Sequence, residues 1–75
     1  VLVLYENFLT ILPESIGRLV NLTVLYLYEN LLTTLPDSII NLDKLDRLML
    51  DNNQLAPDEP GRIRDLLPDD CEIDF

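Results

Sequence analysis

The side chains of this sequence that are capable of chemistry are few, and most of them are acidic. The chain has no His, one Cys, 14 Asp and Glu, and 5 Lys and Arg. Two carboxylate pairs, Asp69 with Asp70 and Asp51 with Asp74, raise the possibility of Ca²⁺ binding or proton transfer. A solvated acidic end of the chain is the simpler interpretation, so we expect no metal ion and no cofactor.

Other kinds of catalytic machinery are missing from the sequence. Nucleophilic and metal-assisted mechanisms need a base beside a nucleophile, a ligand cluster or a Gly-rich phosphate loop, and none is present. The lone Cys71 is in the register of the buried strand positions, beside Leu48, which favours a small core residue over a reactive thiol. Asn21-Leu22-Thr23 fits a glycosylation sequon, but Leu22 must be buried, so we interpret the match as accidental. The sequence therefore predicts a protein that is not an enzyme.

The charge narrows the choice of partner. The formal net charge is −9 over 75 residues, and such a field repels phosphate backbones and anionic lipid headgroups. No apolar run reaches the roughly 20 residues that a transmembrane helix requires. Neither nucleic acid nor a membrane is an expected partner.

A period of 23 residues runs through the chain, and the repeated structure that this period predicts must position any functional site. Asn7, Asn30 and Asn53 follow it, and so do Leu9, Leu32 and Leu55. The unit around the second copy reads Leu22-x-x-Leu25-x-Leu27-x-x-Asn30-x-Leu32-x-x-Leu35-Pro36-x-x-Ile39-x-x-Leu42. A fixed period of this length is typical of a solenoid.

This unit resembles the leucine-rich repeat, in the 23-residue form of intracellular Ras-group and bacterial proteins, and the resemblance covers residues 1–55. It implies an α/β solenoid, a right-handed arc with short parallel strands on the concave face and short 3₁₀ or α turns on the convex face. It also implies a cytoplasmic location and a role in protein–protein interaction, as a scaffold in signalling.

Elementary physics predicts the same unit. Leu25 and Leu27 alternate with outward residues, as in a strand with one buried face. The repeated Asn can satisfy backbone groups left unpaired by the following bend, so an interior Asn ladder is expected. Pro13 and Pro36 stand where helical turns begin. Gly17 has Ile at the equivalent position 40, so we predict that this glycine is not obligatory.

The motif stops after Leu55, and the following residues resemble the C-terminal cap of bacterial leucine-rich-repeat proteins. We expect a helix from Pro60 to Pro68 and a fourth strand from residue 71 to 75, in which Cys71 continues the 23-residue register of Leu48. The chain is thus expected to be one domain, 1–75, with repeats over 1–55 and a cap over 56–75. At the other end, Leu2 would lie on an uncovered edge strand, which predicts preceding repeats, a preceding cap, or self-association through that edge.

The outward strand positions form columns across the concave face, and solenoids commonly bind partners there. The period gives the columns Val3–Tyr26–Met49–Glu72, Tyr5–Tyr28–Asp51–Asp74, Val1–Val24–Arg47–Asp70 and Glu6–Glu29–Asn52–Phe75. The predicted partner-binding residues are Val3, Tyr5, Val24, Tyr26, Tyr28, Arg47, Met49, Asp51, Glu72 and Asp74. Their aromatic half and acidic half suit a protein or peptide with an apolar anchor and a basic segment.

Two other interpretations stay open at the level of sequence. The chain could be the regulatory or substrate-recruiting segment of a larger kinase, GTPase or ubiquitin ligase whose catalytic domain lies outside it. It could also be a structural spacer, in which Tyr26 and Tyr28 merely suit strands and cover their neighbours.

Overall fold

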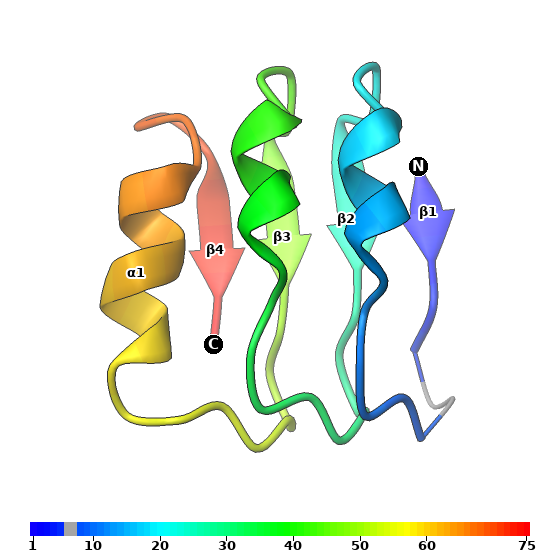
Figure 1. Ribbon diagram of the computed structural model, residues 1–75, viewed down its shortest axis with the longest axis vertical. Helices are drawn as coiled ribbons and strands as arrows, with labels where there is room; N and C mark the ends of the chain where they lie inside the picture. The colour runs from blue at the N-terminus through cyan, green and yellow to red at the C-terminus, as the bar shows by residue number, and fades with distance from the viewer. Residues whose placement is uncertain (6–7) are drawn as a thin grey trace.

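The computed structural model describes residues 1–5 and 8–75 as three strand–helix units side by side, followed by a last strand. The elements in chain order are β1 (Leu2–Val3), the 3₁₀ helix η1 (Glu14–Arg18), β2 (Val24–Tyr26), the 3₁₀ helix η2 (Asp37–Asn41), β3 (Arg47–Met49), α1 (Glu59–Leu66) and β4 (Glu72–Asp74). The strands form one parallel sheet in the order β1-β2-β3-β4. Figure 1 shows η1, η2 and α1 together on one side of this sheet.

The core is aliphatic and lies between the sheet and the helical segments. Leu25 and Leu48 point inward from neighbouring strands and pair in register, and both are buried. From the opposite side, Ile39 of η2 and Ile63 of α1 close the core. The expected 3₁₀ turns are confirmed, and each begins directly after its proline. The opposite face of the sheet, which we call the concave face, carries the alternate residues of the strands.

The predicted asparagine ladder is confirmed for Asn30 and Asn53, whereas Asn7 lies outside the described residues. The Asn30 amide donates to the carbonyl oxygens of Leu4 at 2.7 Å and Leu27 at 3.0 Å. Its Oδ1 accepts a hydrogen bond from the Leu9 amide at 3.0 Å. Asn53 repeats the pattern one unit later. Each asparagine therefore joins its own unit to the preceding one.

The expectation that Gly17 is replaceable is wrong. A Cβ atom added at Gly17 would lie 2.6 Å from both Cβ and the carbonyl oxygen of Ser38, which is far too close. The 3₁₀ helices η1 and η2 pack directly on each other, so their contact requires a residue without a side chain. Ile40 holds the equivalent position in η2, but its side chain is exposed, so the same restriction does not apply there.

Hydrogen bonds and ion pairs attach the C-terminal cap to the preceding repeat, and the 23-residue period does not predict them. The carboxylate of Glu59, at the start of α1, is buried and accepts hydrogen bonds from the Leu35 amide at 3.1 Å and from the Thr34 hydroxyl. Arg62 donates to Glu59 at 3.0 Å and also to a carboxylate oxygen of Asp37. The hydrogen bond to Asp37 raises the pKa of Arg62, so the guanidinium keeps its charge. The helix begins one residue earlier than expected, with Pro60 in its first turn.

The fourth strand is confirmed, but its predicted register is wrong by two residues. Leu48 pairs with Ile73 and Arg47 with Glu72, so the last unit advances by 25 residues and not by 23. An α-helix rises less per residue than a 3₁₀ helix, so α1 needs more residues to span the same height as η2. Cys71 therefore does not lie beside Leu48; it is partly buried before β4, at the edge of the core.

The two-residue shift keeps the inward and outward faces of the strand but changes its columns. Asp74 now pairs with Met49, and Phe75 moves to the inner side of the strand, where the guanidinium of Arg64 lies 5.0 Å from its ring centroid. Phe75 thus leaves the predicted flanking column of the concave face.

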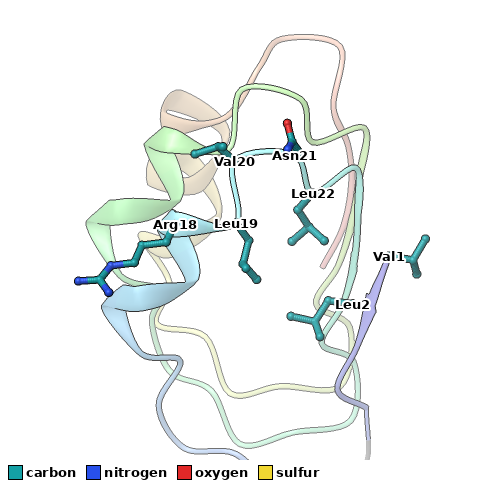
Figure 2. Close-up of a pocket in the computed structure, with 7 residues that line it drawn as sticks. All are labelled: Val1, Leu2, Arg18, Leu19, Val20, Asn21 and Leu22. Atoms are coloured by element: carbon teal, nitrogen blue, oxygen red, sulfur yellow. The ribbon is translucent and has the colours of Figure 1, made fainter.

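The sheet edge at β1 carries an open hollow. Leu2, Leu19 and Leu22 point into the space between β1 and the segment after η1 (Figure 2). Leu19 is 45% exposed, whereas Leu42 at the same place in the next unit is 0% exposed. The difference follows from position alone, because no described element covers Leu19 on its outer side.

Candidate protein-binding surface

The predicted partner-binding residues lie on the concave face. Val3, Tyr26, Met49 and Asp74 form one paired row across the four strands. Val24, Arg47 and Glu72 form a second row. Tyr5, Tyr28 and Asp51 follow the strands and form a third row, in which the Glu29 amide donates to the Asp51 carbonyl oxygen at 3.0 Å. The structure thus brings all ten residues to one face, and Glu6 of the flanking column lies outside the described residues.

The aromatic part of this face is a packed cluster. The rings of Tyr5 and Tyr28 stack with centroids 4.9 Å apart and an angle of 4° between their planes. This separation matches the spacing of about 4.8 Å between neighbouring strands. Tyr26 meets Tyr28 edge-on at 6.2 Å. Val3 remains 45% exposed and Tyr5 42% exposed, so the cluster offers apolar area to a partner.

The acidic part of the face lies over β3 and β4. Arg47, the one cation among the ten residues, forms an ion pair with Glu72 at 2.8 Å. No ion pair within the described chain involves Asp51 or Asp74. The Oδ1 atom of Asp51 is buried, and no described group donates a hydrogen bond to it. Of the three carboxylates in this part of the face, those of Asp51, Glu72 and Asp74, only Glu72 therefore has an ion-pair partner within the described chain.

A second exposed apolar group beside the concave face was missed by the sequence analysis. Phe8 is 79% exposed and Leu31 39% exposed, and both line a hollow together with Glu29, Asn30 and Asn52. Phe8 and Leu31 are 23 residues apart, so the period could have identified them as one more row. Glu29 and Asn52 both have φ of 59°, and this left-handed bend turns the chain away from the strand beside the hollow.

The other residues considered for catalysis or metal binding lie apart from one another in the described part of the chain. Burial raises the pKa of the Cys71 thiol, and the charges of Asp46, Asp70 and Glu72 raise it further. The thiol is consequently protonated at neutral pH and a poor nucleophile. Within residues 1–5 and 8–75, no group of three or more His, Cys, Asp or Glu side chains could hold a metal ion. No helix in the described part of the chain is long and apolar enough to cross a membrane.

Comparisons with known proteins agree with this geometry. The family model described as leucine rich repeat matches residues 1–55. The chain therefore belongs to the leucine-rich-repeat family, whose members form solenoid arcs and serve generally as non-catalytic protein-interaction modules.

A solved structure of a leucine-rich-repeat protein from Leptospira interrogans is 49% identical in sequence, with a TM-score of 0.92. The match covers 97% of this chain but 18% of the Leptospira protein, so this chain spans less than a fifth of that protein's length. No curated protein matches the chain.

Proposed function

We propose that this chain binds another protein through its concave face. The observation that carries the proposal is the packed cluster of the exposed Tyr5 with the half-buried Tyr26 and Tyr28 on a regular sheet. Aromatic side chains are enriched at the centres of protein interfaces. Because the rings already contact each other, they lose less conformational freedom when a partner covers them.

The composition of the face supports a partner with an apolar anchor and a basic segment. Exposed apolar residues lie over β1 and half-buried ones over β2, whereas carboxylates lie over β3 and β4. A net charge of −9 disfavours nucleic acid and anionic membranes as partners. We propose a cytoplasmic location from the similarity to intracellular repeat proteins. We also propose that residues 1–75 form a single domain, with repeats over 1–55 and a cap over 56–75, within a longer array of repeats.

Affinity capture from a lysate of the source cell tests the proposal. The bait is the chain in its native sequence or with Tyr26→Ala and Tyr28→Ala together, and the matched control replaces Ile40, which is exposed on η2, by Ala. A protein retained by the native chain and the control but lost from the double variant would support concave-face binding. Equal retention by all three would show that the site lies elsewhere.

A further inference from the structure

We propose that the concave face binds an extended segment of its partner that runs across the strands, with an apolar residue over β1 and a basic residue four positions away over β4. This inference rests on the proposed function and adds the direction of the partner segment and the spacing of its two contacts. It is based on the row Val3–Tyr26–Met49–Asp74, which takes one residue from each strand.

The chemistry of the concave face changes from β1 to β4. On β1 and directly after it, Val3 is 45% exposed and Tyr5 is 42% exposed. On β4, by contrast, both outward residues, Glu72 and Asp74, are acidic and exposed. A segment lying along β1 or β4 alone would meet only one kind of surface. A partner that matches both ends must therefore extend across the sheet.

Asp74 supplies the negative charge at one end of the row. Its side chain is exposed, and no ion pair in the described part of the chain involves it. Glu72, the other outward residue of β4, differs because it pairs with Arg47 at 2.8 Å. The Asp74 carbonyl oxygen accepts a hydrogen bond from the Leu50 amide at 2.7 Å, which holds the residue beside β3. The Asp74 carboxylate therefore lies on an ordered strand and is open to a cation that arrives from solvent.

The width of the sheet determines the spacing of the two contacts. Neighbouring strands are about 4.8 Å apart, so the row spans about 14 Å from Val3 to Asp74. The ring centroids of Tyr5 and Tyr28, 4.9 Å apart, show the same spacing at the level of the side chains. An extended segment advances about 3.3 Å per residue, so four residues span about 13 Å. Side chains four positions apart also point to the same side of an extended segment, whereas those three or five positions apart point to opposite sides.

The middle of the row suits the middle of such a segment. The residue halfway between the two contacts would face Tyr26 and Met49, which pair in register and are both half-buried. Neither side chain is charged at neutral pH, so an apolar or small residue fits there. A helix advances only about 1.5 Å per residue, so contacts on one of its faces would be about eight residues apart. The spacing of the two contacts therefore distinguishes an extended partner segment from a helical one.

Selection of peptides from a random display library on the 75-residue chain tests the inference. We expect the enriched peptides to carry an apolar and a basic residue four positions apart, in one of the two possible orders. One such peptide is then synthesised with that spacing and with spacings of three, five and eight. In a fluorescence-anisotropy titration, binding should be about threefold or more weaker at the altered spacings, where the basic side chain no longer reaches Asp74. Equal or tighter binding at an altered spacing, or a selection that enriches no such pair, would overturn the inference.

Asp74→Asn and Asp65→Asn are matched variants, because they change the net charge equally. Asp65 is exposed on α1, which lies on the other side of the sheet (Figure 1). Asp74→Asn should weaken binding of the selected peptide about threefold, and replacing the basic residue of the peptide by glutamine should then have no further effect. Asp65→Asn should behave as the native chain does. A basic residue that still contributes to binding in the Asp74→Asn variant would contradict its contact with Asp74 and overturn the inference.

A second pair of variants, Val3→Ser and Val20→Ser, tests the apolar contact. Both valines are exposed, but Val20 lies after η1 and outside the row. Only Val3→Ser should weaken binding of the peptide. Equal affinities of the two variants would show that the apolar residue binds elsewhere, against the inference.

The same titrations separate the inference from the proposed function. Peptides that lose affinity when Tyr26 and Tyr28 are replaced by Ala, but respond neither to spacing nor to Asp74→Asn, would overturn the inference and leave concave-face binding supported. Peptides whose affinity is unchanged by the tyrosine replacements and by Asp74→Asn would overturn both.

Discussion

Replacement of Asn30 by leucine should destabilise the fold by about 3 kcal/mol. Asn30 is 3% exposed, and it forms hydrogen bonds to backbone groups in two units, among them the carbonyl oxygens of Leu4 and Leu27 and the amide of Leu9. Leucine has the same branched outline but is larger and carries no hydrogen-bonding atoms, so the variant loses all of these hydrogen bonds and must also fit extra volume into a buried site. A buried group left without a partner costs roughly 1–3 kcal/mol, and the less buried groups cost less because water reaches them.

Such a loss is a large part of the stability of a small domain, which is about 5–15 kcal/mol at most sizes. For a chain of this length it corresponds to a fall of about 12–24 °C in the midpoint of thermal unfolding. Far-UV circular dichroism during heating and urea titration measures both quantities. The matched control is Asn21→Leu, because Asn21 is exposed and, among the described residues, its side chain accepts only a hydrogen bond from Lys44 at 3.2 Å. Equal midpoints for the two variants would refute the ladder as a source of stability.

Three further outcomes follow from particular contacts. Gly17→Ala should lower the midpoint of thermal unfolding by several degrees, because the added Cβ would lie 2.6 Å from Ser38. The control Gly61→Ala, whose Cβ meets nothing within 4 Å, should leave the midpoint unchanged or raise it. The reverse order of the two midpoints would contradict the packing of η1 on η2. Asp51→Asn should raise the midpoint, since it removes a charge whose Oδ1 has no donor among the described groups, and a lower midpoint would show that Asp51 stabilises the fold. The thiol of Cys71 should react with iodoacetamide at pH 7.5 more slowly in the native chain than in urea, because its pKa is raised by burial and by nearby acids; equal rates would contradict that environment.

The repeat allowed most of the fold to be predicted from the sequence. Identical spacing of Leu25 and Leu48 determines both the parallel pairing and its register, because each unit must bury the same face against the next. The same argument places Asn30 and Asn53 in equivalent surroundings. Prediction from a period works wherever each unit contacts only neighbours like itself.

Prediction from the period stopped where the units stop being alike. The cap exchanges a 3₁₀ helix for α1, so its strand is displaced by two residues and Glu72, not Asp70, lies beside Arg47. The burial of Glu59 depends on donors from Thr34 and from the Leu35 backbone, more than 20 residues away, and no local pattern encodes such a contact. The requirement for Gly17 likewise arises from one contact with Ser38 in the adjacent unit.

The sequence predicted which residues lie on the concave face but not how their side chains are arranged there. Alternation along the strands identified which residues lie on the concave face, since a shift of two residues keeps the side of the sheet. The stacking of Tyr5 on Tyr28 and the lack of a donor for Asp51 Oδ1 depend on side-chain conformations that a period cannot specify.

Site-specific photo-cross-linking tests the central claim, concave-face binding, most directly. A benzophenone amino acid would replace Tyr26 on the concave face in one variant and Ile40 on η2 in another, and both would be irradiated in a lysate of the source cell. We expect a discrete cross-linked protein from position 26 and none from position 40. A cross-link from position 40 alone would place the binding surface on the helical side of the solenoid and contradict the proposal.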